Sequence, residues 1–152
     1  MGKFDDVLLA SDFDNTILNT ERPRRTGGPI PPVSQGNLTA IRYFMAEGGR
    51  FAVATGRALP AFRMFADKVP MNAPAIVCNG AALYDFEAET YLDSILLPEE
   101  VRAQGQAVLD RFPTVAAEAY HLDNVIHAVR PNEFTRQHQH VTHAGVETVD
   151  SL

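Results

Sequence analysis

Two aspartates one residue apart follow an apolar run near the N-terminus. Val7 to Ala10 is uniformly apolar, and Asp12 and Asp14 come after it with Asn15 and Thr16 directly behind. On an extended path the two carboxylates lie on one side, where their repulsion calls for a cation, a shared proton or good solvation. Asn15 tolerates a left-handed backbone and so permits a sharp turn. A metal-assisted phosphoryl site would use these groups, and so would a plain polar turn after a strand.

A second group with chemical potential is Thr55-Gly56-Arg57, which follows the apolar run 51–54. The Thr55 hydroxyl and the Gly56 amide can donate hydrogen bonds to a phosphoryl oxygen, and glycine permits a close approach of backbone to ligand. The guanidinium of Arg57 could face this site or pair with a neighbouring carboxylate, and the sequence leaves both open.

Asn79 and Gly80 follow a third apolar run, 75–78, and open a third loop. A tight turn into the next hairpin is favoured over a direct catalytic role. Cys78, within the predicted strand, is expected to be a small buried residue.

Parallel strands with helical connections would bring these three loops together. The run 7–10 lacks polar alternation, which favours a strand buried on both faces of a parallel sheet. Helices are predicted from Ser34 to about 47 and over 59–69, between strands 51–54 and 75–78, and residues 19–33 are predicted to be a Pro- and Gly-rich loop. A strand, helix, strand crossover lays successive strands side by side and parallel, so all three loops open at one crevice. The fold class is therefore α/β.

The remainder of the chain predicts smaller elements. Residues 82–86 and 90–95 are predicted to form a hairpin, a helix starts near Pro98, and runs 114–120 and 124–129 form an antiparallel pair. His138, His140 and His143 have spacings that suit neither one helical face nor one strand face, so a polar surface is favoured over a metal site.

Composition excludes several classes of protein. The chain has 152 residues, 45% of them hydrophobic, and a formal net charge of -6 without a basic cluster, which gives no footprint for nucleic acid. The apolar runs are too short for a membrane span. Its single cysteine allows no intramolecular disulfide, and a cytoplasmic location is the simplest expectation.

Three motifs in order resemble one known family. Asp12-Phe13-Asp14-Asn15-Thr16, Ala54-Thr55-Gly56-Arg57 and Asn79-Gly80-Ala81 resemble motifs of the haloacid dehalogenase-like (HAD) phosphohydrolases, and most closely those of the Cof-like sugar-phosphatase subgroup with a class IIB cap. The resemblance implies a partial Rossmann-like, three-layer core over residues 1–81, a hairpin and connection over 82–97, and the beginning of an α/β cap domain over 98–152.

The resemblance also implies a chemistry. Asp12 would attack a phosphate monoester to form an aspartyl-phosphate, and Asp14 would protonate the leaving oxygen and then activate water. Mg²⁺ would be held by Asp12 and Asp14, while Thr55, Gly56, Arg57 and Asn79 would bind the substrate, a small phosphorylated metabolite. No nucleic acid or membrane partner is expected.

The chain departs from this pattern in its last part. After the cap, the family continues to a lysine and then an acidic pair, neither of which has a counterpart here, and the first strand has predicted neighbours on one side only. We therefore expect an incomplete and inactive fragment whose partner is the missing C-terminal part of the same protein. The alternative is a non-catalytic phosphate-ligand-binding or regulatory protein, which a true mass near 16.7 kDa would favour.

Overall fold

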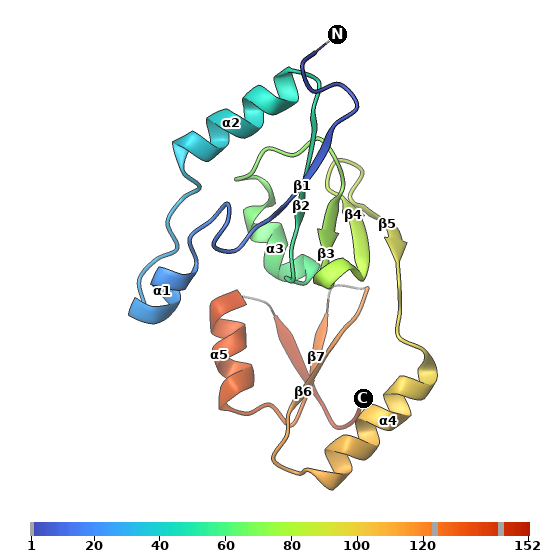
Figure 1. Ribbon diagram of the computed structural model, residues 1–152. Coiled ribbons are helices and arrows are strands. Elements are labelled where there is room, and N and C mark those ends of the chain that lie inside the picture. The colour runs from blue at the N-terminus through green and yellow to red at the C-terminus, as the bar shows by residue number, and fades with distance from the viewer. Residues whose placement is uncertain (1, 123–124, 143–144) are drawn as a thin grey trace. The chain divides into compact units, whose positions relative to one another are not determined.

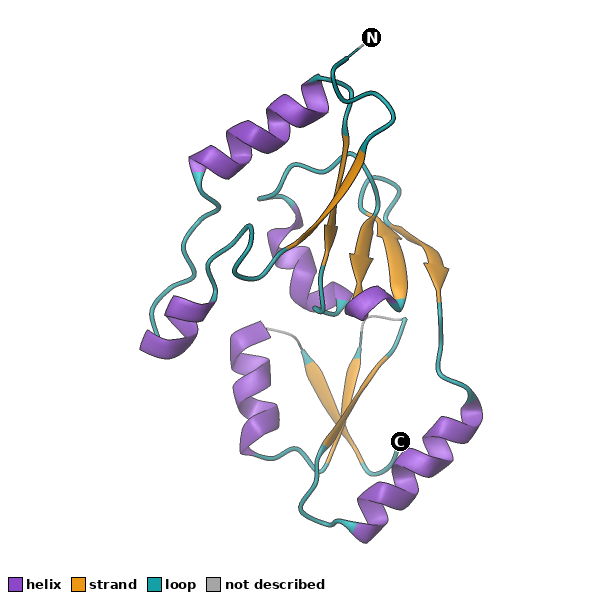
Figure 2. Ribbon diagram, viewed as in Figure 1, coloured by secondary structure: helices purple, strands orange, loops and turns teal. Residues whose placement is uncertain are grey.

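The computed structural model describes residues 2–122, 125–142 and 145–152 as two compact units. The first unit comprises Met1–Arg57 and Phe62–Ser94, and the second comprises Ala58–Ala61 and Ile95–Leu152. Each unit contains its own sheet, drawn as separate groups of orange arrows in Figure 2. The α/β class predicted from the sequence is confirmed.

The first sheet has five strands in chain order, β1-β2-β3-β4-β5 (Figure 1). β1 (Leu8–Asp12), β2 (Arg50–Ala54) and β3 (Ala75–Val77) run parallel, and β4 (Ala82–Asp85) and β5 (Thr90–Ser94) continue antiparallel. The connection from β1 to β2 contains α2 (Gln35–Ala46), and the connection from β2 to β3 contains α3 (Leu59–Ala66). The carboxyl ends of the parallel strands therefore share one edge, as the motif spacing predicted.

Helix ends in this unit follow local sequence signals. Ser34 is the N-cap of α2, and its hydroxyl accepts a hydrogen bond from the Asn37 N–H at 3.1 Å. The chain leaves this helix through Gly48, whose φ of 91° suits glycine. One expectation needs correction: the predicted loop 19–33 contains a short helix, α1 (Glu21–Thr26), with the Gly27 N–H bonded to the Pro23 carbonyl.

The outer strand β1 differs from the fully buried strand that its apolar sequence predicts. Val7, Leu8 and Leu9 are 44%, 62% and 48% exposed. The reason is the strand order, because β1 pairs with β2 alone among the described residues. The sequence also predicted that this strand has neighbours on one side only, and this is confirmed for the described residues. The open side of β1 is therefore an apolar sheet edge.

β3 ends one residue earlier than predicted. Cys78 and Asn79 both have positive φ, 52° and 56°, and lie in the single turn η1 (Cys78–Gly80). Cys78 is half-buried and lies outside the strand, in contrast to the buried strand position expected for it. The predicted hairpin β4–β5 is confirmed.

The second unit holds a sheet of order β6-β7-β8. β6 (Ala117–Tyr120) and β7 (Ile126–Val129) form the predicted antiparallel pair, and β8 (Val146–Val149) joins β7 in parallel. α4 (Glu99–Arg111) and α5 (Glu133–Thr142) are helices of this unit. The sequence predicted neither α5 nor the strand β8. No helix in the described part of the chain has the length and apolar character to cross a membrane.

Candidate active site

Asp12 is the last residue of β1 and lies level with the end of β2. Its Cα pairs in register with that of Ala54, so Thr55 and the loop after it begin beside Asp12. The carboxylate is exposed and accepts a hydrogen bond at Oδ2 from the Thr16 hydroxyl at 2.9 Å. Asp12 therefore lies at the edge of the parallel sheet where such sheets bind ligands.

The turn after β1 is fixed by Asn15. Its φ of 62° confirms the left-handed conformation that the sequence permits. Its side-chain oxygen accepts hydrogen bonds from the backbone N–H groups of Thr20 and Glu21 at 3.1 and 2.8 Å. Asn15 thereby ties the turn after β1 to the start of α1.

Asp14 lies in a two-pronged hydrogen-bonded ion pair with Arg57, which we call the Arg57 fork. The Arg57 Nε–H donates to Oδ2 at 2.8 Å and an Nη2–H donates to Oδ1 at 2.7 Å. The side chains are 8% exposed for Arg57 and 32% exposed for Asp14. Such parallel bonds fix the plane of a carboxylate as well as its charge.

The environment of Asp14 acts on its pKa in two directions. Burial raises the pKa, but the hydrogen bond and the charge of Arg57, with a further hydrogen bond from Thr20, outweigh this and leave the pKa below its ordinary value. Asp14 is therefore a carboxylate at neutral pH in this structure.

Two buried aromatic rings lie against Arg57. Its guanidinium carbon is 4.9 Å from the ring centre of Phe65 and 5.7 Å from that of Phe13. Phe13 is fully buried and Phe65 is 4% exposed. Stacking of this kind holds a guanidinium where an ammonium would not fit equally well.

Backbone hydrogen bonds link the second motif to the third. The Thr55 N–H donates to the Ile76 carbonyl at 2.9 Å, and the Asn79 N–H donates to the Thr55 carbonyl at 3.2 Å. Thr55 is 4% exposed, and its Oγ1 accepts the Arg57 N–H at 3.1 Å. The Thr55 hydroxyl oxygen therefore accepts a hydrogen bond from within its own loop.

Gly56 and Asn79 lie in close contact. A Cβ added to Gly56 would stand 2.8 Å from Oδ1 of Asn79. The absence of a side chain at position 56 therefore lets the amide of Asn79 lie across the second loop.

All six site residues predicted from the sequence belong to the first unit, on three loops linked by the hydrogen bonds above. For Arg57 the structure shows the second of the two alternatives, pairing with a carboxylate. Sequence reasoning missed the bond from Thr16 to Asp12 and the rings beside Arg57. The i, i+4 spacing of Asp12 and Thr16 was the available signal for the first.

The oxygen atoms at this edge suit a hard divalent cation. Mg²⁺ takes one or two carboxylates, with water and substrate phosphate filling its other positions. The Asp12 carboxylate is exposed, whereas that of Asp14 is held by Arg57, so the Asp12 carboxylate and the Asp14 backbone carbonyl are the matching donors. Among the residues that the structure describes, no three His, Cys, Asp or Glu side chains gather to hold a metal.

An open groove of about 630 Å³ lies beside the first motif. It runs between the turn after β1 and the segment before α2. Polar and apolar groups both line it, from Asn15, Thr16, Ile17, Asn19, Glu21, Pro31, Pro32, Ser34 and Asn37. Thr16 borders the groove and also bonds Asp12, so the groove reaches the edge of the site.

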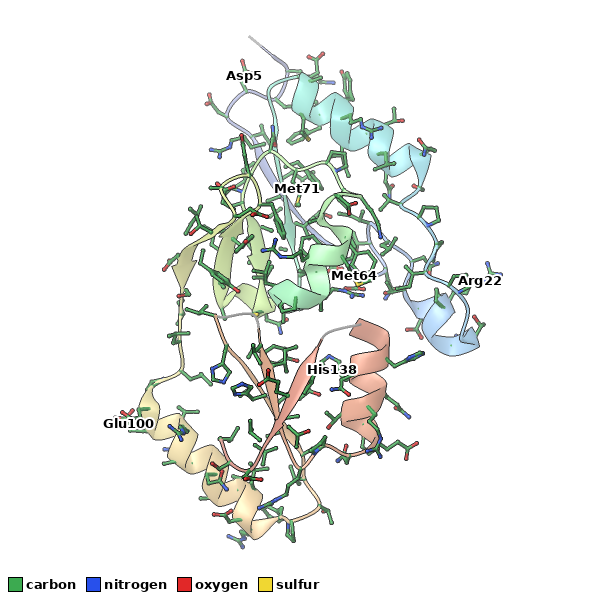
Figure 3. The ribbon with its side chains drawn as sticks, turned by 180° about the vertical axis from the view of Figure 1, so that it is seen from behind. Asp5, Arg22, Met64, Met71, Glu100 and His138 are labelled. Atoms are coloured by element: carbon green, nitrogen blue, oxygen red, sulfur yellow. The ribbon has the colours of Figure 1, made fainter. Side chains whose placement is uncertain are left out.

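The histidines of the second unit make local contacts. His138 projects from α5 (Figure 3), and its Nδ1 lies 2.7 Å from the Glu118 carboxylate. His140 also lies on α5, and His143 lies outside the described residues. Of the predicted cluster His138, His140 and His143, the two members that the structure describes therefore belong to one helix.

Comparison with known proteins gives consistent matches. The model of the haloacid dehalogenase-like hydrolase family matches residues 9–151. Pyridoxal phosphate phosphatase YbhA of Escherichia coli (strain K12) is 31% identical over 91 residues, which cover 60% of this chain and 30% of that protein.

Solved structures extend the likeness to almost the whole chain. The phosphatase BT1666 of Bacteroides thetaiotaomicron matches with a TM-score of 0.69 at 22% identity, over 96% of this chain and 49% of that one. The HAD subclass IIB sugar phosphatase BT4131 matches with a TM-score of 0.68 at 22% identity, over 94% of this chain and 52% of that one. The chain thus spans about half the length of these structures.

Proposed function

The chain belongs to the haloacid dehalogenase-like hydrolases, and from that membership we propose that it forms the N-terminal part of a Mg²⁺-dependent phosphatase for small phosphate monoesters. The observation that carries the proposal is the position of Asp12 at the end of β1, level with the end of β2 and the loop that begins at Thr55. Its exposed carboxylate can reach a phosphorus atom, and Asp14 follows it in the same turn.

In the proposed reaction Asp12 is the nucleophile. Its carboxylate oxygen bonds to phosphorus while the bond from phosphorus to the ester oxygen breaks. Asp14, which is ionised in the structure, first takes up a proton from solvent and then gives it to that leaving oxygen. Asp14 then takes a proton from water, which attacks the phosphorus and restores Asp12 as inorganic phosphate leaves. Mg²⁺ held by Asp12 and the Asp14 carbonyl would neutralise phosphate charge.

The neighbouring loops supply phosphate contacts in this proposal. The Thr55 hydroxyl and the Gly56 N–H donate to phosphoryl oxygens, with Asn79 beside them. The second unit is proposed to be the beginning of a cap that selects the leaving group. The remaining partner is the rest of the same protein, which would bring the lysine and the acidic pair of the family pattern.

The substrate class is a small phosphorylated metabolite, such as a sugar phosphate. The names of the matched proteins support including both sugar phosphates and pyridoxal phosphate in a substrate panel. The panel is to be assayed with the longest form of the protein, with and without Mg²⁺.

The decisive variant is Asp12→Asn, because the amide keeps the volume of the side chain and loses its nucleophilicity. We expect turnover to fall by about 10⁴-fold or more, with phosphate binding and the unfolding midpoint retained. Asp67→Asn, an exposed aspartate at the end of α3, is the matched control and leaves turnover unchanged. Turnover above a few per cent in Asp12→Asn would exclude Asp12 as the nucleophile.

A further inference from the structure

Arg57 is held in a way that suits the positioning of another side chain. Both hydrogen bonds of the Arg57 fork end on Asp14, and Phe65 and Phe13 lie against the guanidinium. We propose that Arg57 is a positioning residue, which orients the Asp14 carboxylate for proton transfer and makes no contact with the substrate phosphate. This inference rests on the proposed phosphatase activity.

The burial of Arg57 argues against a direct role in phosphate binding. Only 8% of its side chain is exposed. A phosphate oxygen that bonded the Nε–H or the Nη2–H of the fork would displace an Asp14 oxygen lying 2.7–2.8 Å from these donors. The displaced carboxylate would then be half-buried without its counter-charge, which is costly.

The fork also explains why this position needs arginine. A planar guanidinium sets the carboxylate plane through two parallel bonds and stacks on aromatic rings, whereas a lysine ammonium is a point charge on a flexible stem. Each carboxylate oxygen has two lone pairs, so an Asp14 oxygen can exchange a proton with the substrate at the lone pair that Arg57 does not use. The two bonds of the fork keep the carboxylate in place during that exchange.

This role predicts a specific change in kinetics. In the longest form of the protein, Arg57→Gln should lower kcat by about 10²-fold, the scale of general acid-base catalysis, with KM changed by less than about threefold. Arg57→Lys should have a kcat at most about tenfold higher than that of Arg57→Gln, because lysine restores the positive charge but cannot form the two parallel bonds of the fork. The loss should be larger for alkyl phosphates than for p-nitrophenyl phosphate, whose leaving group needs no proton.

A double variant separates action through Asp14 from action on the phosphate. If Arg57 acts through Asp14, then Asp14→Asn and Asp14→Asn/Arg57→Gln should have the same kcat within about threefold. Arg63→Gln is the matched control, because Arg63 also lies over aromatic rings, those of Tyr84 and Phe86, away from the site. We expect unchanged kcat and KM for that control.

Two kinetic outcomes would overturn the inference. One is a KM raised tenfold or more by Arg57→Gln at unchanged kcat, which would place Arg57 on the phosphate. The other is an equal further loss from Arg57→Gln in the Asp14→Asn background.

A spectroscopic measurement tests the Arg57 fork without measuring turnover. It needs no Arg57 variant, so it can be made even if Arg57→Gln fails to fold. In the 152-residue chain, the Nε–H proton resonance of Arg57 should be protected from exchange and shift in Asp14→Asn but not in Asp67→Asn. If the resonance is unprotected, or if its chemical shift is unchanged in Asp14→Asn, the inference is refuted even if the phosphatase is active. A protected resonance with no turnover on any ester would instead refute the proposed phosphatase.

Discussion

Gly56 separates the two loops that flank the proposed phosphate position. A methyl group added to Gly56 would stand 2.8 Å from Oδ1 of Asn79, so the Asn79 side chain would have to shift. Asn79 itself takes a left-handed conformation, which Asn adopts more readily than most residues. The position of the Asn79 side chain therefore depends on the absence of a side chain at Gly56.

Gly56→Ala is expected to destabilise the first unit by up to about 1 kcal/mol, because the new Cβ would stand 2.8 Å from Oδ1 of Asn79 and force that exposed side chain to move. Adding Asn79→Gly should restore most of this loss, since glycine removes the clash and accepts the positive φ at that position. Gly28→Ala is the control, because its nearest contact is Thr26 Oγ1 at 3.5 Å. Urea denaturation measures all three, and equal losses for Gly56→Ala and Gly28→Ala would contradict this account.

The Arg57 fork also makes stability depend on pH. The pKa of Asp14 is lowered in the folded state, so the fork contributes its full stability above the ordinary carboxyl pKa and loses it as pH falls through the folded value. We expect Arg57→Gln to cost about 1.5–3 kcal/mol at pH 7, as for hydrogen bonds between charged groups. The difference from wild type should shrink below about pH 4, near the ordinary pKa of aspartate.

Unfolding free energies measured from pH 3 to pH 7 test this dependence. The double variant Asp14→Asn/Arg57→Gln is the control and should show none of the Asp14 contribution. A cost of Arg57→Gln that stays constant over the whole range would show that stacking on Phe65 and Phe13, rather than the ion pair, carries the stability.

At the scale of elements, the α2 connection sets where β2 lies beside β1. Its first turn is closed by Ser34, and Asn37 in the same turn donates a hydrogen bond from its side chain to the Ile17 carbonyl at 3.1 Å. The N-terminus of α2 is thereby joined to the turn after β1. A weaker first turn of this helix would loosen the site.

Ser34→Ala is expected to lower the free energy of unfolding by about 1 kcal/mol through loss of the N-cap. Ser34→Asn, which can cap the same N–H, should cost only a few tenths. Thermal unfolding followed by circular dichroism measures both. Equal destabilisation by the two variants would mean that the hydroxyl acts through another contact.

Strong local signals made most elements of the first unit predictable from the sequence. Short apolar runs separated by capped helices predicted β2, β3 and α2, and parallel pairing then brought Asp12 beside Thr55. α5 was missed because its sequence lacks an apolar stripe, and its Phe134 is 78% exposed. The signal that was present is Asn132, whose side-chain oxygen accepts the N–H groups of Phe134 and Thr135.

The sequence could not predict whether Arg57 faces the ligand site or pairs with a carboxylate. The outcome depends on Phe65 from α3 and on the turn that directs Asp14, which come from distant parts of the chain. The exposure of β1 depends likewise on strand order, because an apolar run has the same sequence at the edge of a sheet and at its centre.

At the scale of the molecule, the chain covers about half the length of the solved structures that it matches. We predict that the 152-residue chain, with its mass verified, turns over the best ester at least about 10⁴-fold more slowly than the longest form. The reason is that two preorganised charge contacts are each worth about 10²–10³ in rate. Turnover within about tenfold would show that groups within this chain complete the site.

The open side of β1 also has a consequence during protein synthesis. β1 is made first and can pair with β2 once residue 54 has emerged, yet Val7, Leu8 and Leu9 stay exposed. At about 5–20 residues per second, a ribosome takes roughly 8–30 s to add another stretch as long as this chain. For that time the open edge of an apolar strand can pair with other nascent chains, which favours aggregation of any longer form during its synthesis.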